Sequence, residues 1–257
     1  MPKFAANLSM LFNELDFLER FEAAAKTGFK AVEYLFPYDF DKQELADRLQ
    51  ASGLKQVLHN LPAGDWAAGE RGNACMPNRV GEFQDGVGRA MEYAAALGCT
   101  QLNCLAGKLP EDVDRALAEQ TLIGNLAFAA RELSAAGIKL LLEPINRFDI
   151  PGFLVNTSGQ ALAIIDAVGS DNLFLQYDIY HMQRMEGELA KTIETNLSRI
   201  PHMQLADNPG RHEPGSGEIN YRFLFDFIDD IGYDGWIGCE YIPSGGTQAG
   251  LGWMAPY

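Results

Sequence analysis

Short apolar runs recur along the chain, and most of them follow an amphipathic stretch that ends at a glycine. Glycine is the expected residue just after a helix, because it adopts a positive φ without a steric penalty. Six such glycines each precede a candidate strand, which indicates a repeated helix–strand unit. They are Gly28, Gly53, Gly98, Gly137, Gly169 and Gly232, and Pro201 marks a seventh junction.

The apolar runs predict eight strands that are buried on both faces. The expected strands are residues 4–8, 31–36, 55–60, 101–106, 139–144, 173–178, 202–207 and 236–241. An open doubly wound sheet is disfavoured, since no glycine-rich phosphate-binding fingerprint follows the first strand. We therefore expect an α/β fold, a single (β/α)8 TIM barrel over residues 1–257, with its active site at the C-terminal ends of the strands.

Side-chain spacing also predicts where two helices begin. Val80, Phe83 and Val87 share one helical face, and Asn78 is placed to cap that helix. Thr157 or Ser158 is placed to cap a later one.

Composition and charge restrict the function. The chain has 257 residues, of which 47% are hydrophobic, and a net charge of −15. This charge disfavours nucleic acid or an anionic membrane as a partner, whereas a local Arg or His could still hold a small anionic substrate. We expect a cytosolic protein, because the first residues lack a signal-peptide pattern and no apolar run reaches the ~18 residues of a membrane span. A homo-oligomer is neither predicted nor excluded by the sequence.

Polar side chains stand near the ends of successive strands, where barrel chemistry takes place. Glu143, Asp178, Gln204 and Glu240 are separated by 35, 26 and 36 residues, and each gap holds one helix and one strand. The side chains can therefore occupy equivalent positions on four neighbouring strands and converge. Burying three carboxylates together requires protonation or a cation between them.

A divalent cation accounts for this set better than ion pairs with basic residues. Carboxylate and amide oxygens suit hard ions such as Mg²⁺ or Mn²⁺. The alternative is that each acid pairs with Lys or Arg, but the strands carry only Lys55 and Lys139, both at strand starts. The sequence thus predicts a metal site made by the four residues.

Four further side chains are candidates for contacts with a substrate. His181 follows Asp178 by three residues and could bind the ion or donate a hydrogen bond to a substrate oxygen. Arg211, in the long polar loop 207–220, could clamp a carboxylate. The third expected strand ends in His59-Asn60, of which His59 is the candidate, and Trp66 in the next loop could cover the pocket.

Several motifs resemble those of the hydroxypyruvate isomerase family, in the sugar isomerase/epimerase branch of the TIM-barrel superfamily. They include NLPAGDWAAGERG, EPINRFDIPGF, YDIYHMQRMEGE, ADNPGRHEPGSGEINY and GWIGCEY, and the likeness covers essentially the whole chain. The related 2-oxo-tetronate isomerases share much of this pattern, including a stretch like VEYLFPYDF. A 2-oxo-tetronate isomerase, or another isomerase or epimerase of small sugar acids, is therefore the alternative.

The resemblance implies roles for individual residues. Glu143 and Glu240 look like the acid/base pair, and with Asp178 and Gln204 they look like the metal ligands. His181 is similar to a substrate-contacting His, and Arg211 lies in a loop that supplies a substrate-binding Arg. Gln204 departs from the wider superfamily, which usually has His there, and an amide is the weaker ligand.

The reaction implied is the interconversion of hydroxypyruvate and tartronate semialdehyde, an aldose–ketose type isomerisation. Two other classes of function remain to be separated from it. DNA repair, as in endonuclease IV, would need a multi-zinc cluster rich in His, and the chain has four His and a charge of −15. A non-catalytic sugar-acid binder would bind the substrate without exchanging its protons.

Overall fold

The computed structural model describes residues 1–257, which form a closed parallel barrel with the strand order β1-β2-β3-β4-β5-β6-β7-β8. The barrel closes through parallel pairing of β8 with β1. The strands are β1 (Lys3–Asn7), β2 (Ala31–Glu33), β3 (Lys55–Asn60), β4 (Gln101–Cys104), β5 (Lys139–Leu142), β6 (Leu173–Asp178), β7 (His202–Leu205) and β8 (Trp236–Cys239). This architecture confirms the predicted TIM barrel.

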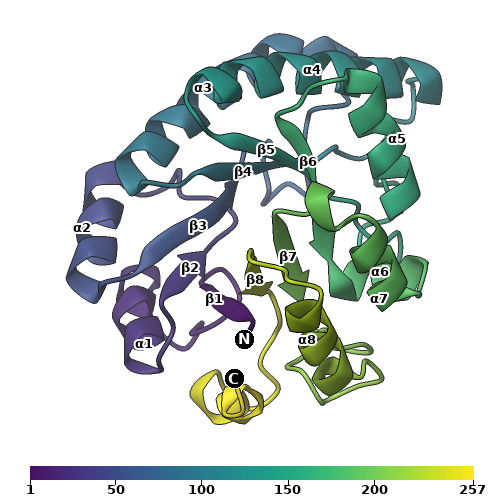
Figure 1. Ribbon diagram of the computed structural model, residues 1–257. Helices are drawn as coiled ribbons and strands as arrows, with labels where there is room; N and C mark the ends of the chain where they lie inside the picture. Colours follow the sequence, from purple (N-terminus) through teal and green to yellow (C-terminus); the bar gives the residue numbers. More distant parts are fainter.

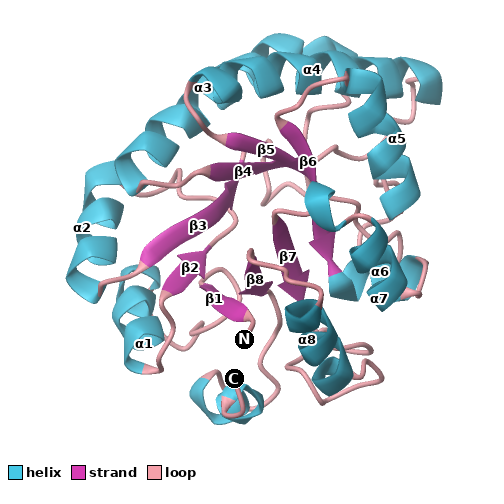
Figure 2. Cartoon of the chain, in the orientation of Figure 1, coloured by secondary structure: helices cyan, strands magenta, loops and turns pink.

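The helices form the outer layer around the strands (Figures 1 and 2). They are α1 (Arg20–Lys26), α2 (Lys42–Ser52), α3 (Val80–Leu97), α4 (Arg115–Ala135), α5 (Ser158–Val168), α6 (Ile179–Met185), α7 (Leu189–Thr195) and α8 (Tyr221–Asp230). Short 3-10 turns are η1 (Phe17–Glu19), η2 (Pro77–Arg79), η3 (Leu197–Arg199) and η4 (Gln248–Met254). None of the helices combines the length and the apolarity needed to cross a membrane.

The C-terminal segment completes the outer layer between α8 and α1 (Figure 1). Trp253 packs edge-on against Phe4 of β1, with ring centroids 5.0 Å apart, and lies 5.7 Å from Phe225 of α8. Tyr257 adds an edge contact to the same Phe225 at 5.2 Å. The chain end therefore covers the apolar outer face of β1.

Helix ends follow the predicted chemistry. Gly53, Gly98 and Gly169 end α2, α3 and α5 in the left-handed conformation, with φ between 63° and 66°. Thr157 caps α5, because its side chain accepts the backbone N–H of Gln160 at 3.2 Å. These positions confirm the periodic helix–strand unit.

Several expected boundaries were wrong. β4, β5, β7 and β8 each end two residues before the expected end, and β1 spans residues 3–7 instead of 4–8. Asn78 lies inside the turn η2, which begins with Pro77, and α3 starts at Val80 without a side-chain cap. The second strand is shorter than residues 31–36, because its pairing with β3 becomes irregular next to Glu33. Residues after Glu33 form the loop that leads to α2.

The irregularity between β2 and β3 decides which side chains of β3 face the barrel. Val32 pairs with Gln56, whereas the next residue, Glu33, pairs with Leu58, so β3 carries one extra residue at this point. An extra residue reverses the faces of all residues that follow it. His59 consequently points outward and Asn60 inward.

The barrel interior is separate from the main hydrophobic core, which lies between strands and helices. A small apolar cluster lies inside, near the N-terminal ends of the strands, and comprises Ala5, Ala31, Val57 and the partly buried Trp236. Toward the C-terminal ends the interior becomes polar. The buried polar side chains include Asn7, Glu33, Asn103, Glu143, Gln176, Asp178, His202, Gln204 and Glu240.

Candidate active site

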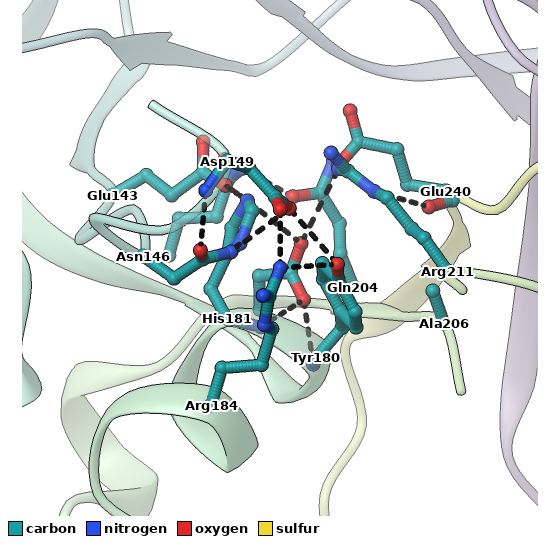
Figure 3. A network of polar contacts seen from close by, with 12 residues as sticks. Glu143, Asn146, Asp149, Tyr180, His181, Arg184, Gln204, Ala206, Arg211 and Glu240 are labelled. Carbon is teal, nitrogen blue, oxygen red and sulfur yellow. Dashed lines mark hydrogen bonds and ion pairs between the residues drawn. The ribbon is translucent and has the colours of Figure 1, made fainter. Parts of the chain in front are cut away.

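Four polar side chains lie at or next to the ends of β5 to β8, at the C-terminal end of the barrel. They are Glu143, Asp178, Gln204 and Glu240. Asp178 is the last residue of β6 and pairs in register with Gln204 of β7. Glu143 and Glu240 each follow their strand by one residue, after β5 and β8. All four are nearly inaccessible to solvent, at 1% to 4% exposure. Figure 3 shows Glu143 and Glu240 on opposite sides of this polar network.

Asp178 serves both the local backbone and the site. Its Oδ1 accepts the backbone N–H groups of Tyr180 and His181 at 2.8 and 3.2 Å, which starts α6 at the end of the strand. Its Oδ2 is buried and has no hydrogen-bond partner. One oxygen therefore fixes the carboxylate, and the other remains available for a ligand.

His181, on the first turn of α6, faces two carboxylates. Its Nε2 lies 3.6 Å from Oδ2 of Asp178 and 3.8 Å from Oε1 of Glu143. Burial lowers the pKa of His181 to about 4, although the charge of Asp178 opposes this shift. The imidazole is therefore neutral at pH 7, and its tautomer decides what it can do.

Asn146, in the loop after β5, fixes that tautomer. Its Oδ1 accepts the backbone N–H groups of Phe148 and Asp149, so its Nδ2 must face His181 and Asp149. Nδ2 lies 2.7 Å from Nδ1 of His181, which accepts its hydrogen. The remaining proton of the neutral ring is then on Nε2. His181 thus presents an N–H donor to the site.

Burial and mutual repulsion raise the pKa values of the two glutamic acids. For Glu143 the burial is the larger cause, and the charges of Glu240 and Asp178 add to it. Burial raises the pKa of Glu240 to about 8, and Arg211 partly opposes this rise. At this pKa Glu240 can both hold and release a proton near neutral pH, which general acid–base chemistry requires.

Arg211 supplies the positive charge of the site. Its Nη2 donates to Oε2 of Glu240 at 3.0 Å and lies 3.9 Å from Oδ2 of Asp178. Its guanidinium lies over the ring of Tyr180, 5.2 Å from the centroid. Although burial opposes its charge, the surrounding carboxylates raise the pKa of Arg211. Its φ of 57° is a left-handed conformation, unusual for a residue with a side chain and frequent at functional sites.

The loop that carries Arg211 is anchored by Asp207, two residues after the end of β7. The carboxylate of Asp207 accepts backbone N–H groups of Gly215, Gly217 and Ile219 at 2.9 to 3.0 Å. Any side chain at Gly217 would begin 2.2 Å from the carbonyl oxygen of Asn208, so the close approach requires glycine. The long loop is therefore held in one shape, which directs Arg211 into the barrel.

The family of this chain is shown by sequence matches that cover almost all of its residues. The xylose isomerase-like TIM barrel family matches residues 21–257. The chain belongs to this family. It is 57% identical to the hydroxypyruvate isomerase of Escherichia coli and 51% identical to the 2-oxo-tetronate isomerase of Cupriavidus necator; each alignment covers 100% of this chain and at least 99% of the relative. These relatives confirm the predicted class of enzyme, an isomerase.

Solved structures agree with the fold. A structure titled AP endonuclease, family 2, from Brucella melitensis superposes with a TM-score of 0.97 at 47% identity, over 100% of this chain and 99% of that one. A structure of L-ribulose 3-epimerase superposes over 100% of this chain and 87% of that one, with a TM-score of 0.78 at 24% identity. The second likeness concerns the barrel fold alone.

Two further polar residues near the site were not chosen as candidates from the sequence. Asn103 of β4 donates to Oε2 of Glu143 at 2.8 Å and to Oδ1 of Asn60 at 3.1 Å. Asn103 was detectable as a polar residue inside an apolar strand. Asn60 stands next to His59 at the strand end, but strand alternation without the extra residue in β3 selects His59 instead.

His59 does not join the carboxylates, and its predicted contact with a substrate is not supported by its position. Its ring packs near Tyr38, with centroids 6.1 Å apart, and faces the backbone of Ala90 in α3. Burial lowers the pKa of His59 to about 3, so the ring is neutral. The extra residue in β3 is the physical reason, since it turns this side chain out of the barrel.

Trp66 lies in the wall of a neighbouring cavity of about 690 Å³, bounded by the loops after β1, β2 and β3. It packs against Phe36, with ring centroids 5.0 Å apart, and the guanidinium of Arg71 lies 4.0 Å from its ring. The cavity lies on the β1–β3 side of the mouth, whereas Glu143 and Glu240 flank β5 to β8. The role of Trp66 as a cover stays a prediction.

The site has the donor set of a metal centre. Ligand atoms of Glu143, Asp178 and His181 lie within 4.8 Å of one another. The unpartnered Oδ2 of Asp178 and the raised pKa of Glu143 both fit a cation that would compensate the buried charge. Two of the four predicted ligands, Glu143 and Asp178, thus lie together with His181 in a group that could hold a metal ion.

Proposed function

We propose that this protein is a hydroxypyruvate isomerase, which interconverts hydroxypyruvate and tartronate semialdehyde. The observation that carries the proposal is the pair Glu143 and Glu240, two buried acids with raised pKa values on opposite sides of one site. The 57% identity to the Escherichia coli hydroxypyruvate isomerase over the full chain supports this substrate.

The reaction moves one hydrogen between neighbouring carbons. A proton leaves C3 of hydroxypyruvate, an enediolate forms, and a proton arrives at C2, while the hydroxyl and carbonyl oxygens exchange roles. Glu143 and Glu240 are the catalytic residues in this proposal: one carboxylate accepts the C3 proton and a carboxyl group returns a proton at C2. General acid–base catalysis typically contributes about 10²–10⁴-fold, so positioning and electrostatic stabilisation must supply the rest.

Other side chains bind and orient the substrate. The Nε2–H of His181 donates to a substrate oxygen on which negative charge develops. Arg211 binds the substrate carboxylate through its planar guanidinium. Asn103 holds the carboxylate of Glu143 through the 2.8 Å hydrogen bond, so that its free oxygen faces the substrate.

Glu143, Asp178, Gln204 and Glu240 would hold the metal ion, with Mg²⁺ or Mn²⁺ preferred because the donors are oxygens. A bound divalent ion supplies Lewis-acid stabilisation of negative charge on the substrate oxygens. His181 is left outside this ligand set, because its Nδ1 accepts from Asn146 and its Nε2 carries the proton.

A ¹H-NMR assay tests the proposal directly. The purified protein is incubated with hydroxypyruvate and, separately, with 2-oxo-tetronate in D₂O, after chelation and after addition of Mg²⁺ or Mn²⁺. We expect conversion and loss of the C3 proton signals with hydroxypyruvate, and a higher kcat/KM for it than for 2-oxo-tetronate. A higher kcat/KM for 2-oxo-tetronate would favour the alternative activity, and binding without exchange would contradict both.

Some expectations stay predictions. They are a single domain over residues 1–257, a cytosolic location and the lack of a nucleic-acid partner. The net charge of −15 opposes binding of a polyanion, which speaks against carrying the name of the Brucella structure over to this chain.

A further inference from the structure

A buried carboxylate, Glu33, lies beneath the site and accepts three hydrogen bonds. It ends β2 and is 1% exposed. Its Oε1 accepts from Nδ2 of Asn7 at 2.9 Å and from Nε2 of Gln204 at 2.8 Å. Its Oε2 lies 2.6 Å from Nε2 of His202. The proposed acid–base reaction does not use this group, so its burial needs another reason.

The contact with Glu33 decides which way the amide of Gln204 points. A carboxylate accepts hydrogen bonds and donates none, so Gln204 must present its NH₂ group to Glu33. The amide oxygen therefore lies on the other side, toward β6, where it accepts from Nε2 of Gln176 at 2.6 Å. The same strand carries Asp178, which pairs in register with Gln204. The oxygen thus faces β6, where its observed partner is Gln176, two residues before Asp178.

The neighbouring strand leaves space for Glu33. Gly238 of β8 pairs in register with Gln204. A Cβ atom at position 238 would lie 2.2 Å from Oε1 of Glu33, so any other residue would overlap the carboxylate itself. Asn7 is fixed as well, because its Oδ1 accepts the backbone N–H of Ser9 at 3.1 Å. Strands β1, β7 and β8 therefore together hold the carboxylate of Glu33 against the amide of Gln204.

We propose that Glu33 is a positioning residue for Gln204: by binding the NH₂ group it leaves the amide oxygen as the atom that can reach the metal, and it makes that oxygen a stronger ligand. A negative charge at the NH₂ group polarises the amide and increases the electron density on its oxygen. An amide is otherwise a weaker ligand than a carboxylate or an imidazole, and outer hydrogen-bond partners commonly tune such ligands. The inference rests on the proposed metal role of Gln204.

Metal affinity, measured independently of turnover, tests the proposal. The probe is Mn²⁺, and its dissociation constant is read from the EPR signal of free Mn²⁺ in chelator-treated, purified protein. We expect Glu33→Gln, which removes the charge and keeps the shape, to weaken binding about tenfold, the lower end of what loss of an outer partner costs. Thermal unfolding of the same sample verifies that the variant is folded.

A double-mutant cycle separates an effect through Gln204 from a general loosening of the barrel. In a Gln204→Ala background, Glu33→Gln should change the Mn²⁺ dissociation constant by less than twofold. An equal loss in both backgrounds would overturn the proposal, as would a folded Glu33→Gln variant that binds like the wild type. If Glu33→Gln does not fold, Glu33→Asp replaces it: it keeps the charge opposite His202 but withdraws from Gln204, and unchanged affinity would overturn the proposal.

The wild-type control distinguishes this inference from the proposed function. Failure of the wild type to bind Mn²⁺ would overturn both the metal site and the role of Glu33. Binding that is insensitive to Glu33 would overturn the role of Glu33 alone. Binding that depends on Glu33, in a protein that does not isomerise hydroxypyruvate, would support the role of Glu33 while contradicting the proposed activity.

Discussion

The Nδ2 atom of Asn146 lies 2.7 Å from Nδ1 of His181 and thereby places the ring proton on Nε2, which faces the carboxylates. The amide cannot be reversed without cost, because its oxygen already accepts two backbone N–H groups. A histidine with this tautomer donates a hydrogen bond and cannot bind a metal through Nε2. The contact between these two residues thus favours a substrate-binding role for His181 over a ligand role.

Replacing the Nδ2 donor of Asn146 with an acceptor tests the substrate-binding role of His181. Asn146→Asp keeps the acceptor for the backbone but draws the proton of His181 to Nδ1. We expect kcat/KM to fall about 10²-fold, the usual cost of losing one donor to a developing oxyanion. ¹⁵N NMR of the imidazole should report the new tautomer. If His181 is instead a metal ligand, the same change should strengthen Mn²⁺ binding, as a carboxylate behind a ligating His does.

The two glutamic acids should be separately essential. Glu143→Gln and Glu240→Gln remove the proton acceptor or donor, and we expect each to lower kcat by at least about 10²–10⁴-fold. Circular dichroism should show a retained fold. Glu132→Gln, at a half-buried position of α4 outside the barrel mouth, is the matched control and should stay within twofold of the wild type. Substantial turnover in either site variant would remove that residue from the acid–base pair.

The increase in Tm that a bound metal ion causes should depend on pH. Burial raises the pKa of Glu143, and that of Glu240 to about 8, above the ordinary 4.5. The contribution of such acids to stability is fully present below pH 4.5 and is lost as pH rises toward 8. We therefore expect added Mn²⁺ or Mg²⁺ to raise the Tm of chelated protein more at pH 8 than at pH 6. Equal shifts at both pH values would contradict this coupling.

Loss of Arg211 should weaken substrate binding. Hydrogen bonds to charged groups contribute about 1.5–3 kcal/mol, so Arg211→Gln should raise KM for hydroxypyruvate by about 10- to 100-fold. Steady-state kinetics at saturating metal measure the change. Arg147→Gln is the control, because Arg147 lies exposed in the loop after β5 with its guanidinium over Phe148. A normal KM in Arg211→Gln would mean that another group binds the carboxylate.

His59 should matter for acid stability and not for turnover. Its pKa is lowered from 6.5 to about 3 by burial, so the stability it contributes is present above pH 6.5 and is lost as pH falls toward 3. We expect His59→Leu to flatten the loss of stability between pH 7 and pH 5, measured by urea unfolding. Its kinetic constants should stay within twofold of the wild type. A tenfold rise in KM would return His59 to the substrate site.

Much of the architecture was determined by local sequence pattern. Gly53, Gly98 and Gly169 end helices where the pattern predicts, because a left-handed backbone conformation is a property of one residue and its neighbours. The recurring helix–strand unit then leaves few topologies for a chain of this length. The spacing of Glu143, Asp178, Gln204 and Glu240 predicts their gathering for the same reason, since equivalent positions of a repeated unit meet at one end of the barrel.

Contacts between segments far apart in the chain were decided only by tertiary structure. Whether His59 or Asn60 enters the barrel depends on one extra residue in the pairing of β3 with β2, which the pattern of β3 alone does not contain. The tautomer of His181 depends on Asn146, and the orientation of Gln204 depends on Glu33, 171 residues away. Apolar periodicity reports which face of a segment is buried. It does not report which hydrogen-bond partner a buried polar side chain will meet, because contacts between strands form only once the register is set.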